Sequence, residues 1–209
     1  MRRPAAARIY GCAAVLLSYP DASFTADLAA VARAVAALPA GRARTGLEAT
    51  TEWLSQMTPM QAATAYVDTF DLKRGTSLYL TYYRHGDTRE RGMALAALGD
   101  CYRASGFQLA PGELPDFLPA LLELAACDRA GAAILAEQRV GLDALAAALD
   151  QAGSPYHPAV IAVIDALPGP SRADRAALER YRSQGPPSEQ VGLEPFAPPE
   201  ILGDKVARR

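Results

Sequence analysis

Apolar side chains recur every three or four positions along most of the chain, the spacing that gathers them on one face of an α-helix. Ile9, Ala13, Leu16 and Leu17 form the first such stripe. Similar stripes follow around 28–38, 47–54, 63–70, 95–102, 118–125, 134–149, 160–167 and 178–181. The pattern predicts an all-α fold, a single-domain helical bundle over residues 1–184.

Polar residues at fixed spacing indicate where several of these helices begin. Thr58 precedes Pro59 and Gln61, which predicts an N-cap, a proline at the first helical position and a capping box. The same three-residue spacing occurs at 87–90 and 171–174 and predicts two further capped starts. A helix is also expected from about Pro115 to Ala126, and another over 130–150 with a bend near Gly141.

Residues 76–83 have the sequence TSLYLTYY, which is β-branched and aromatic and favours a strand by propensity alone. The sequence offers no second strand to pair with it, and a lone strand would leave its backbone hydrogen bonds unmade. We therefore expect a buried helix here.

The two ends of the chain differ from the middle. Arg2 and Arg3 followed by an apolar run faintly resemble a targeting signal, but the helical stripe from Ile9 to Leu17 accounts for these residues. Five prolines and scattered charges without periodicity follow Gly185, which predicts a flexible Pro-rich C-terminal tail over 185–209. No segment approaches the roughly 20 apolar residues that cross a bilayer. We expect a cytoplasmic protein with no stable membrane insertion.

Composition narrows the function classes. The 209 residues are 50% hydrophobic and 21% charged, with a net charge of −2, which speaks against a nucleic-acid partner. The three cysteines are dispersed, as in a reducing compartment. Only two histidines are present, and a structural zinc site needs about four well-placed ligands. Neither a metal site nor a cofactor is expected.

The densest polar cluster, residues 84–91, has two interpretations. His85 with Asp87 has the make-up of an acid–base pair, and the three arginines of the cluster that of an anion site. Alternatively, Asp87 caps a helix and the arginines face solvent, and the pattern favours this second interpretation. The chain also lacks a dinucleotide-binding fingerprint, a P-loop, a nucleophile elbow and a zinc-protease motif. No catalytic residues are predicted, and an enzyme is disfavoured.

Five aromatic residues lie close together in the sequence: Tyr66, Phe70, Tyr79, Tyr82 and Tyr83. Aromatic side chains on helices can line a groove that accepts an amphipathic peptide helix. Core packing would explain the same residues, and several tyrosine hydroxyls then need partners. Both interpretations stay open at the level of sequence.

Three successive segments resemble the NarJ family, the assembly chaperones of the membrane-bound respiratory nitrate reductase. They are YVDTFDLKR at 66–74, TSLYLTYY at 76–83 and HGDTRERG at 85–92. The segment 104–126 is similar to the same family in order and spacing. The family is related to the TorD and DmsD redox-enzyme maturation chaperones. In those relatives a Pro-Asp-His motif and a later Glu lie at the peptide-binding surface. Here Pro115 and Asp116 match and Glu123 follows, but Phe117 stands in place of the histidine.

The resemblance implies a non-catalytic chaperone. Its expected partner is the apo catalytic (α) subunit of nitrate reductase, bound through its N-terminal segment. The chaperone would keep that subunit competent for molybdenum cofactor and iron–sulfur insertion before it docks at the membrane. We therefore predict a peptide-binding site, with His85 making binding pH-dependent. Its residues are Tyr66, Asp68, Phe70, Asp71, Tyr79, Tyr82, Tyr83, His85, Asp87 and Asp116.

Two other functions remain as alternatives. In the first, the polar cluster holds a phosphate-bearing ligand, and the chain is a cofactor-handling helical protein that binds a molybdopterin nucleotide directly. In the second, the chain is a helix-turn-helix regulator, which requires a basic recognition helix that the sequence lacks.

Overall fold

The structure is a computed structural model that describes residues 3–187. Within this range eleven α-helices are joined by short connections and two further helical turns, and no regular strand forms. The prediction of an all-α fold is therefore confirmed. The predicted tail begins at 185, and its residues 188–209 lie outside the described range. In chain order the elements are α1 (Arg3–Leu16), α2 (Phe24–Ala36), α3 (Arg42–Ser55), α4 (Pro59–Tyr66), η1 (Val67–Asp71), η2 (Arg74–Thr76), α5 (Thr81–His85), α6 (Arg89–Ala104), α7 (Leu118–Cys127), α8 (Arg129–Glu137), α9 (Arg139–Gln151), α10 (His157–Ala166) and α11 (Arg172–Gln184).

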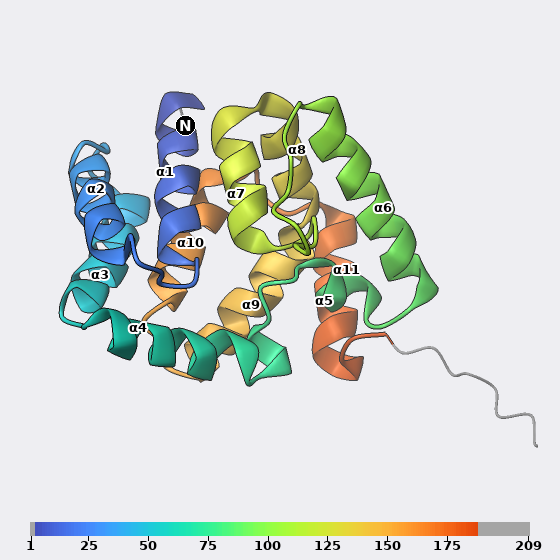
Figure 1. The fold of residues 1–209 in the computed structure, drawn as a ribbon. Helices are drawn as coiled ribbons and strands as arrows, with labels where there is room; N and C mark the ends of the chain where they lie inside the picture. The colour runs from blue at the N-terminus through green and yellow to red at the C-terminus, as the bar shows by residue number, and fades with distance from the viewer. Residues whose placement is uncertain (1–2, 188–209) are drawn as a thin grey trace, which may run out of the picture.

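The core lies where α1, α7, α9 and α10 meet (Figure 1). The first helix packs along α7 and also touches α2, α3 and α10, while α3 packs on α10. Ile9, Ala13, Leu16 and Leu17 are all buried, so the first apolar stripe is the inner face of a helix. The hairpin of α2 and α3 lies at one side of the molecule, and α5, α6 and α11 lie at the other. No helix in the described part of the chain is both long and apolar enough to cross a membrane.

Two of the three predicted capping boxes are present. Thr58 and Gln61 cap α4 reciprocally, and Ser171 and Asp174 do the same for α11. The box predicted at 87–90 is wrong. Thr88 is the N-cap residue of α6, and no side chain caps the helix, because the Thr88 hydroxyl donates a hydrogen bond to the carbonyl of His85.

Two predicted helices differ from the structure in detail. Residues 115–117 precede α7 because their backbone pairs with another segment, described below. The expected helix over 130–150 is two helices, which part at Gln138 and not at Gly141. Gly141 instead lets a neighbour come close, since a Cβ there would lie 2.7 Å from the carbonyl oxygen of Leu80.

The expected buried helix over 76–83 is only partly correct. Residues 77–80 lie outside any helix, Leu80 is the N-cap residue of α5, and α5 itself begins at Thr81. Tyr79 forms an isolated antiparallel bridge with Phe117. Leu80 N–H donates to the carbonyl of Asp116 at 3.1 Å, and Leu118 N–H donates to the carbonyl of Leu78 at 2.9 Å. The backbone at 77–80 thus finds its partners in the loop before α7, which no strand-like sequence pattern marks.

Candidate functional site

The structure distributes the predicted peptide-binding residues between core and surface. Asp68, Asp71 and Asp87 are exposed, whereas Tyr79, Tyr82 and His85 are half-buried. The other four residues are buried, with exposed fractions of 5% or less: Tyr66, Phe70, Tyr83 and Asp116. A partner bound at the surface of this conformation would therefore reach only the first six side chains directly.

Tyr66 and Phe70 belong to a row of aromatic rings that crosses the molecule. Successive ring centroids lie 4.7–5.5 Å apart in the order Tyr19, Tyr66, Phe70, Tyr156 and Trp53. Most contacts are edge-to-face or tilted, which aromatic pairs favour. The row ties α4 and η1 to the start of α10 and to α3. Its inner members serve packing, as one of the two sequence interpretations expected.

The residues that follow Tyr66 form a π-helical turn, η1. Such turns are rare in proteins overall, and those that occur often lie at functional sites. They shift the side chains that follow out of α-helical register. Phe70 points into the aromatic row, while Asp68 and Asp71 remain at the surface. Leu72, directly after the turn, is 71% exposed. The turn thus presents an apolar side chain next to carboxylates.

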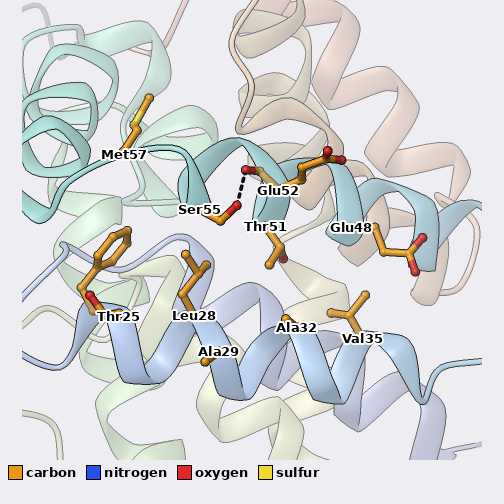
Figure 2. Close-up of a pocket in the computed structure, with 11 residues that line it drawn as sticks. Thr25, Leu28, Ala29, Ala32, Val35, Glu48, Thr51, Glu52, Ser55 and Met57 are labelled. Carbon is orange, nitrogen blue, oxygen red and sulfur yellow. Dashed lines mark hydrogen bonds between the residues drawn. The ribbon is translucent and has the colours of Figure 1, made fainter.

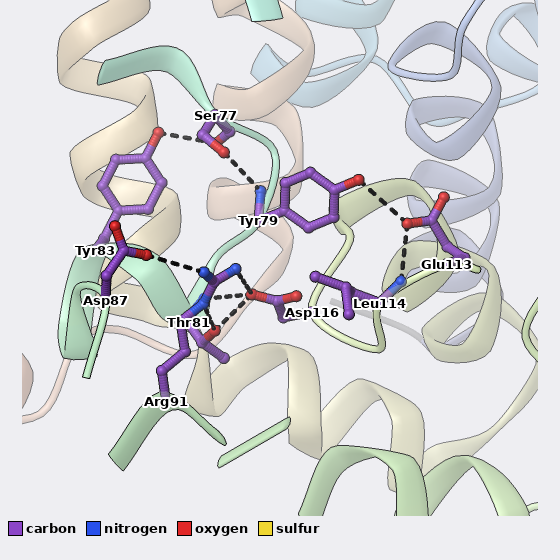
Figure 3. A network of polar contacts seen from close by, with 9 residues as sticks. All are labelled: Ser77, Tyr79, Thr81, Tyr83, Asp87, Arg91, Glu113, Leu114 and Asp116. Carbon is purple, nitrogen blue, oxygen red and sulfur yellow. Dashed lines mark hydrogen bonds and ion pairs between the residues drawn. The ribbon is translucent and has the colours of Figure 1, made fainter. Parts of the chain in front are cut away.

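The segment at 77–80 pairs with the loop before α7. The Tyr79 hydroxyl donates a hydrogen bond to Glu113 at 3.3 Å, and its ring lies against Phe117 (Figure 3). Burial raises the pKa of Tyr79, and the charges of Glu113 and Asp71 add to this shift. The exposed Leu72 and Leu114 directly follow Asp71 and Glu113 in the chain, so we group these residues with Tyr79. We call this group the acidic–aromatic patch, and it comprises Asp71, Leu72, Tyr79, Glu113 and Leu114.

Asp116 lies beneath this patch and is fully buried. Its Oδ2 accepts hydrogen bonds from the backbone N–H of Thr81 at 3.2 Å and from the Thr81 hydroxyl at 2.5 Å (Figure 3). The Arg91 guanidinium lies 3.6 Å from the same oxygen. Two hydrogen bonds and a cation offset the cost of burying this charge. The contacts hold the loop before α7 to the start of α5.

Arg91 connects several of the predicted residues. Besides Asp116, its guanidinium contacts the Thr81 hydroxyl at 3.3 Å and Asp87 at 3.4 Å, and it lies 5.9 Å from the centre of the Tyr82 ring. His85 Nδ1, at the end of α5, lies 3.6 Å from Glu90 of α6. The polar cluster at 84–91 is thus largely engaged in internal pairs.

Tyr83 turns away from the patch. Its hydroxyl lies within hydrogen-bonding distance of the carbonyls of Gly75 and Ser77, at 3.0 and 2.8 Å, and its ring packs against Tyr181 of α11. Burial raises the pKa of the Tyr83 phenol. This tyrosine therefore closes the turn at 74–77 and anchors α11.

Sequence reasoning missed several members of these contacts. Glu113 and Thr81 are not among the predicted site residues, and the sequence interpretations of Arg91 are an anion site or, as favoured, a solvent-facing position. Its i,i+4 spacing from Asp87 is visible in the sequence, whereas its contact with Asp116 depends on the tertiary fold. Within residues 3–187 no cluster of three or more metal-ligating side chains occurs.

Comparison with known proteins places this geometry in a family. The family model described as nitrate reductase delta subunit matches residues 35–162, which include the π turn, the segment at 77–80 and the loop before α7. The chain belongs to the nitrate reductase delta subunit family. The resemblance to NarJ proteins is confirmed by individual relatives as well.

Three relatives illustrate the range of this family. The nitrate reductase-like protein NarX of Mycobacterium tuberculosis H37Rv is 41% identical over 157 residues, which cover 74% of this chain and 24% of NarX. The probable nitrate reductase molybdenum cofactor assembly chaperone NarJ of Bacillus subtilis is 38% identical over 111 residues, 53% of this chain and 60% of the relative. The corresponding chaperone NarJ of Escherichia coli K12 is 40% identical over 111 residues, 52% of this chain and 47% of the relative. The chain thus spans between about a quarter and three fifths of the lengths of these relatives.

Proposed function

We propose that this protein is an assembly chaperone that binds the N-terminal segment of the apo nitrate reductase α subunit. It would hold that subunit competent for molybdenum cofactor and iron–sulfur insertion before membrane docking. Support comes from family membership and from two relatives whose names describe molybdenum cofactor assembly chaperones rather than catalysts. The observation that carries the proposal is that the family match includes every predicted peptide-binding residue, from Tyr66 to Asp116.

The acidic–aromatic patch is the part of the predicted site that a peptide would meet first. Leu72 and Leu114 offer exposed apolar surface, and Asp71 and Glu113 add negative charge beside them. Such a surface fits a segment with both apolar and basic side chains, which it would hold by apolar contact and steer by charge. Asp68 and Asp87 remain candidates for the same role at its margins. The buried predicted residues would act by holding the patch in shape.

Titration calorimetry tests the proposal directly. A synthetic peptide from the N-terminus of the nitrate reductase α subunit of the same organism is titrated into the full chain at two pH values. We expect a dissociation constant near or below 1 μM, which corresponds to about −8 kcal/mol. A scrambled peptide of the same composition should give no heat. If the native peptide gives no heat at either pH and does not compete with the intact subunit, the proposed partner segment is wrong.

Matched variants then test the patch. Glu113→Gln removes the charge beside Tyr79, whereas Glu179→Gln removes one from the exposed face of α11. Exposed charge pairs contribute modestly, so we expect Glu113→Gln to weaken binding about two- to fivefold, and less at high salt. Glu179→Gln should leave the dissociation constant unchanged. Equal effects of the two variants would indicate that only net charge matters and that the patch is not the site.

A further inference from the structure

A hollow in the described part of the chain lies between α2 and α3, and none of the predicted peptide-binding residues lines it. Its volume is about 630 Å³ (Figure 2). Along α2 the lining side chains run from Phe24 to Val35, three turns of helix or about 17 Å. Met57, which follows the end of α3, also lines the groove. The hollow therefore has the length and open shape of a groove for a short helix, rather than those of a closed ligand cavity.

The floor and one wall of this groove are apolar. Leu28, Ala29 and Ala32 project from α2, and Val35 closes the floor. Small side chains such as alanine allow the backbone of a second helix to approach closely. Because Ala29 and Ala32 are both exposed, this apolar surface meets solvent in the free protein.

The opposite wall carries the charge. Of the two hydroxyl groups that α3 contributes, Thr51 donates to the carbonyl of Leu47 at 2.7 Å, and Ser55 donates to the carbonyl of Glu52 at 2.7 Å. Both hydroxyl groups therefore donate their hydrogen bonds to the backbone of α3 itself. Every charged residue of the lining is a glutamate. Glu48 is paired with Arg44 at 2.7 Å, while the carboxylate of Glu52 has no ion-pair partner within the described residues.

We propose that the groove between α2 and α3 is a second docking surface, which binds a short amphipathic helix of a partner protein. The apolar face of that helix would lie on Ala29 and Ala32, and a lysine or arginine would face Glu52. This inference goes beyond the proposed function, because the groove contains none of the predicted peptide-binding residues and the proposal stands without the identity of the client. Helix-in-groove recognition of this kind uses apolar anchors at i, i+3, i+4 and i+7.

Charge favours such a helix over a second copy of this chain. A two-fold dimer centred on the groove would bring the Glu48 and Glu52 carboxylates of both copies into one interface. Like charges in a desolvated interface oppose association. A basic helix instead supplies the counter-charge that Glu52 lacks. A helix of only three turns is marginal by itself, so it would fold as it binds and bind with modest affinity.

Neighbouring alanines on α2 provide a matched pair of variants. Ala29 and Ala30 are both exposed and in mid-helix, but only Ala29 lines the groove, whereas Ala30 lines a shallower hollow toward α1. Ala29→Glu and Ala30→Glu change charge, volume and helix propensity equally. Circular dichroism and the melting temperature of each variant check that the fold is kept.

The probe is a synthetic helical peptide of about three turns with leucines at i, i+3 and i+7 and two lysines one turn apart. Its twin carries glutamates in place of the lysines. We expect the full wild-type chain to bind the basic peptide with a dissociation constant between about 1 μM and 1 mM, and to bind the acidic twin at least tenfold more weakly. Ala29→Glu should weaken binding at least tenfold and Ala30→Glu less than twofold. Glu52→Gln should weaken it about two- to fivefold.

Three results would overturn the inference. The first is the absence of binding to either peptide. The second is equal loss of binding in Ala29→Glu and Ala30→Glu, which would assign the contact to another face. The third is a dimer of the wild-type chain in sedimentation that Ala29→Glu dissolves, which would make a second copy the occupant. Because the probe peptide contains no nitrate reductase sequence, none of these results bears on the proposed function.

Discussion

Thr81 presents two donors, its backbone N–H and its hydroxyl, to the same carboxylate oxygen of Asp116. Both residues are fully buried and lie 35 positions apart in the chain. The contact joins the start of α5 to the loop before α7, and Arg91 of α6 completes it. Three segments of the predicted peptide-binding region are therefore held together by one side chain that no surface partner can reach.

Replacing Asp116 should destabilise the fold rather than alter a contact surface. Asp116→Ala leaves two buried donors of Thr81 unpaired and leaves Arg91 without its buried partner. Loss of one member of a buried charge pair typically costs about 3–5 kcal/mol, and urea denaturation would measure it. Asp100→Ala is the control, because Asp100 is exposed and pairs only with Arg103, so its loss should cost less than about 1 kcal/mol. An Asp116→Ala protein of unchanged stability that fails to bind the client peptide would instead assign Asp116 to the binding surface.

Asp87→Asn, in contrast, should leave the stability of the fold nearly unchanged. The Asp87 carboxylate is 67% exposed, caps no helix and pairs with Arg91 at 3.4 Å. Exposed pairs of this kind contribute about 0–1 kcal/mol, so the free energy of unfolding should change by no more than that. Any larger loss, measured by urea denaturation, would show that Asp87 supports Arg91 beneath the patch. If stability is kept and peptide binding falls, Asp87 belongs to the contact surface, as the sequence predicts.

Buried tyrosines make the fold sensitive to alkaline pH. Burial raises the pKa of the Tyr66, Tyr83 and Tyr156 hydroxyls above their ordinary value of 10.0. In the unfolded chain these tyrosines release their protons at lower pH than in the native state. Their contribution to stability is therefore complete below pH 10 and is lost as the pH rises through the native values.

Two signals followed together would test this expectation. Tyrosinate absorbance and far-ultraviolet circular dichroism, recorded against pH, should show the buried tyrosines ionising only as the helices unfold above pH 10. Ionisation of all tyrosines near pH 10 with the helical signal intact would contradict the burial of these rings.

How much of this fold the sequence predicts depends on how far apart in the chain the interacting residues lie. Helix starts such as Thr58 with Gln61 depend on residues three positions apart, and the sequence reveals them. The antiparallel bridge at Tyr79 depends on pairing with residues 116–118, and the loop before α7 carries no strand-like pattern. Propensity favoured a strand there, and the absence of a visible partner led to the wrong expectation of a helix.

The same distinction applies to the candidate site. Residue types and order identified the region from Tyr66 to Asp116, but not which side chains face solvent. Tyr79 and Tyr83 are both tyrosines of the segment at 77–80 and the short helix after it, yet one borders the surface and the other is buried. The groove between α2 and α3 left no signal, because exposed alanines such as Ala29 also suit an ordinary solvent-facing helix.

Two glycines in helices should respond to alanine in opposite directions. At Gly141 in α9 an added Cβ would lie 2.7 Å from the Leu80 carbonyl oxygen and 3.2 Å from its Cα, so the segment at 77–80 would have to move. At Gly99 in α6 nothing lies within 4 Å of the added atom. Overpacking typically costs about 1–3 kcal/mol, whereas alanine in an open helix position stabilises by about 0.5–1 kcal/mol. We expect Gly141→Ala to lower the urea midpoint and Gly99→Ala to raise it. Because Leu80 leads into Thr81 and Asp116, Gly141→Ala should also weaken client binding more than its loss of stability explains. If both variants gain stability, the close contact between α9 and the segment at 77–80 does not exist in solution.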